Sequence, residues 1–250
     1  MLESKDSMVS LSLLRRLSEK FGIFVLVSKI KNQIPMENAP IKFYKFREMA
    51  MLNTFGIMTV STCDVMNNWL NTNDSVSDFE NTTLDLALNR YAELGKGWNE
   101  EELKMHFIST IFNVANPNIP NVCKTYFERP LDGIVNNYQM HVITDCMIAS
   151  PKFGGDPDKP FFFLQEYKQS QAFGKTDPQG QMLAAMLLAQ EANADGKHLL
   201  GCYVIEKNWY FTTLLGLNYC VSEQYNSTKK DDLLQIVFIL RKLKELILNR

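Results

Sequence analysis

The sequence predicts an α/β fold, because extended apolar segments alternate with amphipathic helices in the second half of the chain. The clearest strands are apolar runs at residues 139–149 and 160–170, and a stretch rich in Pro, Gly and Asp lies between them. A helix at 178–192 and a further strand at 199–205 follow. The coarse order is helices, then α-β-β-β-α-β with a β-hairpin extension, then a helix.

Length and composition are those of a globular protein. The 250 residues are 46% hydrophobic and 22% charged, which excludes wholesale disorder. The net charge of −2 excludes a polybasic nucleic-acid-binding chain, although a local basic groove is compatible with it. Apolar runs fall far short of the roughly 18–20 residues of a membrane span. Five scattered cysteines without a Cys-x-x-Cys pair favour a reducing compartment. We therefore expect a cytoplasmic protein without a membrane partner or a secretory signal.

The first part of the chain reads as a mostly helical segment, residues 1–95, packed on a core formed by residues 96–250. No function can be assigned to this segment from its residues. Its helical signals, in chain order, are a leucine stripe at Leu11, Leu13, Leu14 and Leu17, an apolar-periodic stretch at 46–70, and a short helix at 84–94 that ends at Gly95 after a polar loop at 71–83.

A helix with an acidic first turn begins after Trp98. Asn99 predicts its N-cap, and Glu102, three residues later, completes a capping-box pattern. At roughly 100° per residue, Glu100 projects near the middle of the apolar face, Glu101 at its edge and Glu102 away from it. Because an acidic first turn also suits the helix dipole, the choice of inward acid stays open between Glu100 and Glu101. The apolar face consists of Leu103, Phe107, Ile108, Ile111, Phe112 and Ala115.

The remaining core elements are marked by turn and cap residues. A first core strand is expected within 121–135. Asp177 followed by proline is typical of a helix start, and Gly196 is placed where a helix stop is expected. The elements after it are a strand at 199–205, a turn at 206–208, a returning strand at 209–215 and an amphipathic helix from about Lys230.

Charged side chains inside two apolar strands are the strongest functional signal. Desolvating an unpaired carboxylate costs several kcal/mol. Strand alternation places Glu166 and Lys168 on one face of the later strand, and Asp145 projects from the earlier strand. If the two strands are hairpin neighbours, these three side chains converge. Such a group suits Mg²⁺, which takes carboxylate, carbonyl and water oxygens, and the lysine can stabilise developing charge. The structural alternative is a buried lysine–carboxylate network without catalysis.

Asp145, followed after twenty residues by Glu166-Tyr167-Lys168, resembles the PD-(D/E)XK nuclease superfamily. The resemblance implies a restriction-endonuclease-like αβββαβ core with a central mixed sheet flanked by helices. Glu100 on the preceding helix and Gln181 on the helix after the third strand add to it. Within the superfamily, the chain is most similar to small bacterial members of undescribed function.

The resemblance covers roughly residues 98–250 and departs from the family pattern at one position. Thr144 stands before Asp145, where the pattern often has proline. Ser170 stands where some members carry an additional polar group. The short motif alone is common by chance, so its specificity comes from the placement of the charges inside apolar strands.

The resemblance implies metal-assisted phosphodiester hydrolysis, with Mg²⁺ as the cation and Mn²⁺ as a substitute. The implied metal ligands are Asp145, Glu166 and the Tyr167 carbonyl, with Glu100 holding a metal-bound water or a second ion. Asp145, Glu166, Lys168 and Gln181 are the implied catalytic residues. Lys168 would position and help deprotonate the attacking water, and Gln181 would hydrogen-bond near the scissile phosphate or to the lysine.

Two functions remain open at this point. The first is a nuclease whose partner is nucleic acid, with DNA favoured over RNA. The second is a catalytically inactive protein of the same fold that acts as a binding or assembly module, with a homodimer as one form of it. The near-neutral charge favours the second, because tight DNA binders usually display a basic surface. The intact set of Asp145, Glu166 and Lys168 favours the first.

Overall fold

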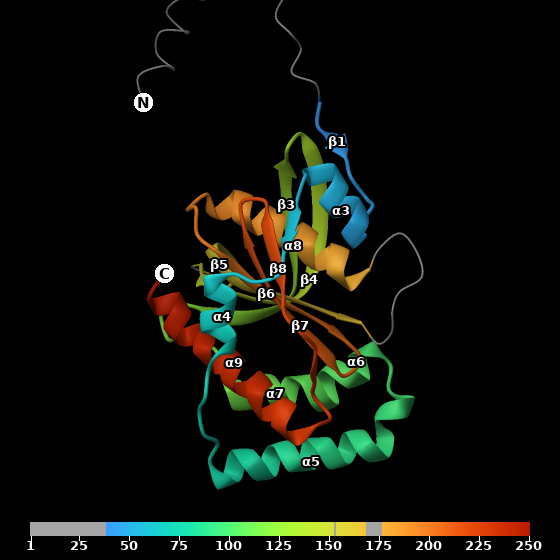
Figure 1. The fold of residues 1–250 in the computed structure, drawn as a ribbon, viewed down its shortest axis with the longest axis vertical. Helices are drawn as coiled ribbons and strands as arrows, with labels where there is room; N and C mark the ends of the chain where they lie inside the picture. The colour runs from blue at the N-terminus through green and yellow to red at the C-terminus, as the bar shows by residue number, and fades with distance from the viewer. Residues whose placement is uncertain (1–38, 153, 169–176) are drawn as a thin grey trace, which may run out of the picture. The chain divides into compact units, whose positions relative to one another are not determined.

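The computed structural model describes residues 39–152, 154–168 and 177–250. Ile41–Arg250 form one compact unit. Within the described residues this unit is an α/β structure, in which helices flank a mixed, open sheet of nine strands (Figure 1). The predicted α/β class is confirmed. The leucine stripe at Leu11–Leu17 and the polar Ser170 lie outside the described residues.

The sheet combines antiparallel and parallel strands. Its order is β1-β4-β5-β6-β7-β8-β2, with β3 paired to β4 and β9 paired to β7. The strands β3, β4 and β5 run antiparallel in sequence, β6 runs parallel to β5, and β6, β7 and β8 are antiparallel. The strands are β1 (Ile41–Lys42), β2 (Met58–Val60), β3 (Lys124–Val135), β4 (Tyr138–Pro151), β5 (Pro157–Lys168), β6 (Leu199–Ile205), β7 (Asn208–Leu215), β8 (Asn218–Val221) and β9 (Tyr225–Asn226).

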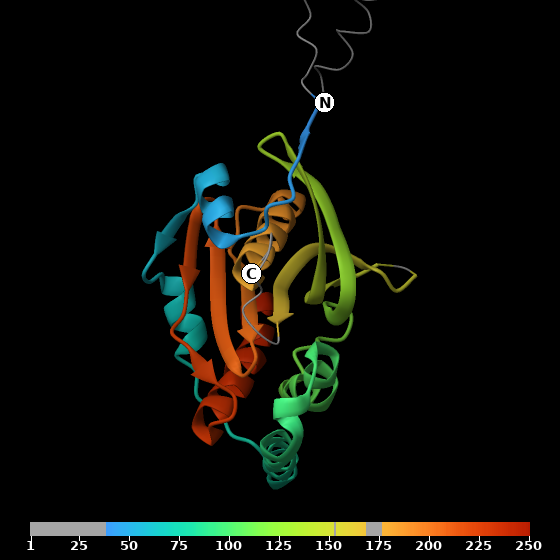
Figure 2. The same cartoon turned by 90° about the vertical axis from the view of Figure 1, so that its right-hand side faces the viewer.

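The helices cover the two faces of the sheet unequally. The helices, in order, are α3 (Glu48–Phe55), α4 (Asp64–Leu70), α5 (Asp78–Leu94), α6 (Glu100–Leu103), α7 (Ser109–Ala115), α8 (Pro178–Asn193) and α9 (Lys230–Leu248). A π-helical turn, Lys104–Ile108, joins α6 to α7. On one face α8 packs against β3 to β7, with α3 beside it; on the other face lie α4, α7 and α9, with α5 outside them (Figures 1 and 2).

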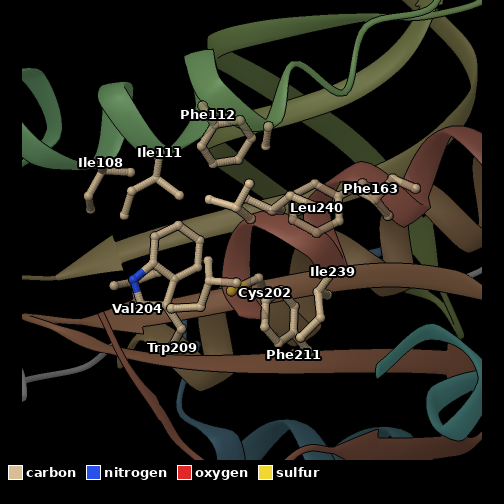
Figure 3. Packing of buried hydrophobic residues seen from close by; sticks show 14 of the residues in the cluster. Ile108, Ile111, Phe112, Phe163, Cys202, Val204, Trp209, Phe211, Ile239 and Leu240 are labelled. Carbon is tan, nitrogen blue, oxygen red and sulfur yellow. The ribbon is translucent and has the colours of Figure 1, made fainter. Parts of the chain in front are cut away.

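Each face of the sheet has its own apolar core. The α9 side buries aromatic and aliphatic side chains from the sheet and the helices, including Trp209, Phe163 and Phe112 (Figure 3). Trp69 joins two helices in this core, because its indole N–H donates to the Ile239 carbonyl at 2.9 Å. The α8 side is built around that helix, whose residues Met182 to Ala189 are all buried. This nearly continuous apolar run explains why the helix lies against the sheet along its length.

The sequence-based elements differ from the structure at several positions, three of which concern helices. The apolar stretch at 46–70 is two helices and a short strand, because α3 ends at Gly56 in the left-handed region (φ 67°). The polar stretch at 71–83 is not all loop, because α5 begins at Asp78 behind a capping box of Ser77 and Glu80. The helix α8 ends two residues before the predicted Gly196 stop, at the left-handed residue Ala194 (φ 48°).

The state of the cysteines and the character of the helices are two further features of the fold. All five cysteines are free, and Cys146 and Cys202 are buried. None of the helices in the ranges 39–152, 154–168 and 177–250 has the length and apolar character needed to cross a lipid bilayer.

One carboxylate caps two helices. The Asp177 carboxylate accepts from the Gly180 N–H at 2.6 Å, as the predicted helix start requires, and also from the Glu48 N–H at 3.2 Å in the first turn of α3. The Asp177 N–H donates in turn to the Phe46 carbonyl at 2.9 Å. The N-terminus of α8 is therefore fixed against the chain that enters α3, which requires close backbone approach at Gly180.

Gly180→Ala should destabilise the protein by about 1–3 kcal/mol, the usual range for overpacking. A Cβ atom at Gly180 would lie 2.4 Å from the Phe46 carbonyl oxygen and 2.6 Å from the Arg47 carbonyl carbon, and backbone atoms cannot yield cheaply. The measurement is the urea midpoint of unfolding. Gly97→Ala is the control, because nothing lies within 4 Å of its Cβ position, and it should change stability by less than about 0.5 kcal/mol. Equal midpoints for the two variants would contradict the close approach.

Candidate functional site

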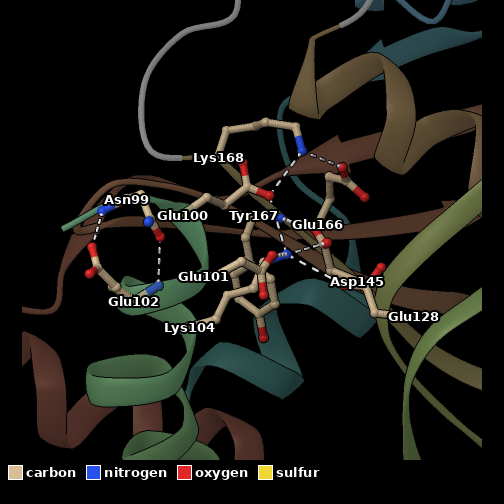
Figure 4. Close-up of polar contacts among 10 residues, drawn as sticks. All are labelled: Asn99, Glu100, Glu101, Glu102, Lys104, Glu128, Asp145, Glu166, Tyr167 and Lys168. Carbon is tan, nitrogen blue, oxygen red and sulfur yellow. Dashed lines mark hydrogen bonds and ion pairs between the residues drawn. The ribbon is translucent and has the colours of Figure 1, made fainter.

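A cluster of charged side chains forms where β4 and β5 diverge, next to the N-terminus of α6 (Figure 4). The β4–β5 ladder ends at Cys146 opposite Gln165. Beyond this pair, a side chain replaces the backbone as the hydrogen-bond acceptor. The Tyr167 N–H donates to Oδ2 of the Asp145 carboxylate at 2.7 Å. The members of the cluster are Glu100, Glu101 and Lys104 from the helical segment, Glu128 from β3, Asp145 from β4, and Glu166 and Lys168 from β5.

The predicted hairpin places its charges together. Strands β4 and β5 are antiparallel neighbours, as the prediction requires. Asp145 and Glu166 are both buried, at 8% and 3% exposed. The Lys168 ammonium lies 3.1 Å from Glu166 Oε1 and 3.5 Å from Glu100 Oε1. The structure therefore brings the strand residues and the helix acid to one location.

Helix α6 delivers Glu100 to the site as its periodicity predicts. Asn99 and Glu102 form the capping box, with the Glu102 N–H to Asn99 Oδ1 at 2.9 Å and the Asn99 N–H to Glu102 Oε2 at 2.8 Å (Figure 4). This cap fixes the start of the helix and turns Glu102 outward. Glu101 is 74% exposed along its side chain, whereas Glu100 contacts both lysines of the cluster. Of the two acids that the sequence left open, Glu100 is the one that faces Lys168.

Lys104 lies at the centre of the acidic side chains. Its ammonium Nζ is 2.7 Å from Asp145 Oδ1, and its side chain is only 14% exposed. Its methylene stem is enclosed by the protein, with the ammonium 5.8 Å from the centre of the Tyr167 ring. The other carboxylates around the same nitrogen are Glu101 at 3.1 Å, Glu100 at 3.2 Å and Glu128 at 3.4 Å.

Glu128 reaches the cluster from a distorted position in β3. The ladder pairs Phe127 with Cys146 and Arg129 with Thr144, so Glu128 lies opposite Asp145. Its φ of 50° is in the left-handed region, which disfavours residues other than glycine. Such backbone conformations persist only where surrounding contacts compensate. The left-handed conformation of Glu128 therefore occurs together with the contact between its carboxylate and Lys104.

Burial dominates the electrostatics of the carboxylates. Desolvation, with the charge of Asp145 second, raises the pKa of Glu166 to about 8, despite the attraction of Lys168. The pKa of Glu128 is also raised, first by burial and then by Asp145, against the opposing effect of Lys104. Glu166 therefore keeps its proton at pH values where an isolated carboxyl group would lose it.

The two lysines respond in the opposite way. Burial lowers the pKa of Lys104, but the hydrogen bond and charge of Asp145, with Glu101 and Glu100, outweigh it and leave the pKa raised. Burial likewise lowers the pKa of Lys168, and the charges of Glu166, Asp145 and Glu100 reverse the effect. Both side chains are therefore ammonium groups at neutral pH, and each acts as a hydrogen-bond donor.

Two predicted site residues have a different relation to the cluster. The Tyr167 side chain is buried in the α9-side core, and its backbone N–H contacts Asp145. Gln181 lies in the first turns of α8, and its Oε1 is buried without a hydrogen-bond partner in the part of the chain that the structure describes. Gln181 is therefore not joined to Lys168 or Glu166 by a hydrogen bond through that oxygen.

Lys104 and Glu128 were not predicted from the sequence. A signal for Lys104 existed, because it is four residues after Glu100 and such residues share a helix face. For Glu128 there was none, since its position opposite Asp145 depends on the pairing of β3 with β4 and its left-handed backbone conformation has no local sequence signal.

A pocket of about 410 Å³ adjoins the cluster on its α7 side. Its walls are apolar and include Ile108, Phe112, Phe127 and the Tyr167 ring. The charged end is formed by the cluster residues Glu101, Lys104, Glu128 and Asp145. The volume is within the roughly 300–1,000 Å³ of small-molecule sites.

The carboxyl groups of the cluster meet the needs of a metal ion only in part. Among the described residues, no three His, Cys, Asp or Glu side chains are arranged to hold one. Asp145 and Glu166 are the two buried carboxyl groups of the cluster. Mg²⁺ commonly binds proteins through only one or two carboxylates and keeps several waters. The chemistry of this pair fits such a cation, although a fully protein-built cage does not exist here.

Comparison with known proteins gives no family for this chain. A scan against known protein families returned no match, and neither did a search of curated proteins.

Proposed function

We propose that this protein hydrolyses phosphodiester bonds in nucleic acid with the help of a divalent cation, in the manner of PD-(D/E)XK nucleases. The observation that carries the proposal is the convergence of Asp145, Glu166 and Lys168, with Glu100 from the preceding helix, at the diverging ends of β4 and β5. The order of α6–α7, β3, β4, β5, α8 and β6, with β6 parallel to β5, supports a restriction-endonuclease-like core.

An excess of negative charge supports cation binding. Glu166, with its raised pKa, keeps a proton near neutral pH in the metal-free protein, and the cluster still contains four other carboxylates (Glu100, Glu101, Glu128 and Asp145) against the two ammonium groups of Lys104 and Lys168. Glu166 is buried beside the charge of Asp145, which favours a further positive charge there. We propose Asp145, Glu166 and the Tyr167 carbonyl as ligands of Mg²⁺ or Mn²⁺, with Glu100 holding a coordinated water. Such an ion supplies charge stabilisation and a water of lowered pKa.

Lys168 supplies a positioned donor. Its ammonium is held by Glu166 and Glu100 at the edge of the cluster, with 22% of its side chain exposed. From there it can donate to the attacking water and to a phosphate oxygen as negative charge develops. Help in deprotonating the water requires that the neighbouring carboxylate charges first be neutralised, because they raise the pKa of Lys168. The Gln181 side chain remains a candidate contact near the scissile phosphate, to which its amide N–H groups could donate.

The adjoining pocket supports a nucleic-acid substrate. Phe127 is 55% exposed at its wall, and aromatic faces of this kind can stack on a base. A phosphate held at the cluster would place the neighbouring nucleoside within reach of this wall. DNA is the first substrate to test, with RNA as the alternative.

The test is cleavage of plasmid, single-stranded DNA and RNA with Mg²⁺, Mn²⁺ or EDTA. We expect cutting with either metal and none with EDTA. Lys168→Met should lower the rate at least about 10²-fold, as loss of a charge-stabilising donor does. Lys152→Met is the matched control, because this exposed lysine follows β4 at the other end of the same hairpin.

The outcome distinguishes the enzyme from its alternative. Equal cleavage by Lys168→Met and Lys152→Met would exclude the proposed site. If wild type cuts none of the three substrates, a binding or assembly module with the same fold becomes the better assignment.

A further inference from the structure

We propose that Lys104 is a resident cation that occupies the place of a second metal ion, so that the site takes up one divalent ion per chain. The identity of that one ion rests on the proposed function. The exclusion of a second metal ion rests on the geometry around Lys104.

The first argument is the ligand shell of the ammonium. Asp145, Glu101, Glu100 and Glu128 place carboxylate oxygens at 2.7, 3.1, 3.2 and 3.4 Å from Nζ. These are hydrogen-bond distances, whereas Mg²⁺ requires oxygens at about 2.0–2.1 Å. The shell is therefore spaced for an ammonium group.

The second argument is that the ammonium is held in place. Lys104 begins the π-helical turn, and its N–H donates to the carbonyls of both Glu100 and Glu101 in the capped helix. Its stem is enclosed, as the small exposed fraction of its side chain shows. Figure 4 shows its ammonium directed between Asp145 and the acidic side chains around it. A metal ion at this position would have to displace a tethered charge.

The third argument comes from β3. Glu128 adopts a left-handed backbone conformation, and its carboxylate contacts Lys104. Glu128 also lies opposite Asp145 across the β3–β4 ladder. Lys104 thus joins acids of the helix, β3 and β4, the bridging role that a second metal ion performs in two-metal sites.

Asp145 can serve Lys104 and one metal ion together. Each of its oxygens has two lone pairs, and the contacts with Lys104 and the Tyr167 N–H use one on each oxygen. The other lone pairs are directed away from these donors. Lys104 therefore occupies the position of a second metal ion but leaves the position of the first ion open. Glu166 and Lys168 lie beside that first position.

Mn²⁺ binding to the full chain tests the proposal, with the free ion followed by electron paramagnetic resonance. Wild type should bind one Mn²⁺ per chain. Lys104→Met removes the charge and keeps much of the stem, and it should bind a second Mn²⁺ at least about tenfold more tightly than any second ion in wild type. Its melting temperature should rise with Mn²⁺ more than that of wild type, because ions that bind the native state stabilise it.

Lys230→Met is the matched control. This lysine also forms a lysine–aspartate pair, with Asp85 at 2.6 Å, but it lies at the start of α9 outside the cluster. It should bind Mn²⁺ as wild type does. Lys104→Arg, which keeps a positive charge, should also bind one ion. If Lys104→Met does not fold, Lys104→Gln carries the test, because its amide removes the positive charge but keeps a hydrogen-bond donor for the buried Asp145 carboxylate.

The outcomes separate this inference from the proposed function. One ion in wild type and two in Lys104→Met support both. One ion with equal affinity in both proteins overturns the inference and leaves the function standing. Binding in Lys104→Met alone supports the inference and removes the metal from the proposed function. Absence of binding in both proteins overturns both.

Discussion

Lys104→Met should lower the free energy of unfolding of the metal-free protein by about 3–5 kcal/mol, the range for removing one partner of a buried ion pair. Asp145 would remain buried beside the other carboxyl groups of the cluster, with no ammonium on its Oδ1. Most of the effect comes from Asp145, because Glu101 and Glu128 are largely exposed and water screens their charges. The measurement is equilibrium unfolding in urea with EDTA present.

The control for this prediction is Lys230→Met. Its pair with Asp85 is short, but both side chains are substantially exposed. Pairs of this kind contribute at most about 1 kcal/mol. Equal losses for Lys104→Met and Lys230→Met would show that Lys104 does not neutralise a buried charge.

Glu166 should make the metal-free protein less stable as the pH rises. The pKa of this carboxyl is about 8 in the folded protein and near 4.5 without the fold. Between these values the folded protein keeps a proton that the unfolded chain has lost, so unfolding releases it. The contribution of Glu166 is therefore fully present below pH 4.5 and is lost as the pH rises to about 8, by at most about 1.4 kcal/mol per pH unit.

Glu166→Gln isolates this contribution. Glutamine does not titrate, so the stability of the variant relative to wild type should rise from pH 5 to 8 and level off above it. Urea unfolding in EDTA at each pH measures the difference. Glu80→Gln is a control of opposite sign, because hydrogen bonding by the Ser77 backbone lowers the pKa of Glu80. Its difference from wild type should change only at acid pH. A difference between wild type and Glu166→Gln that is flat from pH 5 to 8 would contradict the raised pKa.

Local patterns predicted the elements that carry the site. Alternation predicted the strands around Asp145 and Glu166, and turn residues predicted their hairpin, since both signals are encoded within a few residues. Helical periodicity predicted the buried face that includes Leu103 and Phe107 and the inward side of Glu100. These features depend on neighbours in sequence, which a single chain displays directly.

The features that were missed depend on distant parts of the chain. The short strands β1 and β2 have little pattern of their own and exist through pairing with β4 and β8. The first turns of α5 are polar and exposed, so the apolar pattern does not show where this helix begins. Ser77 and Glu80, which form its capping box, are the local signal for that start. The spacing of Lys104 from Glu100 can be seen in the sequence. Its contacts with Asp145 and Glu128 cannot, because only the folded sheet brings these residues to it.

The segment from Ile41 to Val60 supplies strands at both ends of the sheet order, because β1 pairs with β4 and β2 pairs with β8. A single short stretch thereby occupies backbone donors and acceptors that would otherwise face other molecules. Unpaired strands of this kind recruit strands from neighbouring chains, which leads to aggregation. Losing this stretch would therefore threaten solubility before it disturbed the charged cluster, which contains none of its residues.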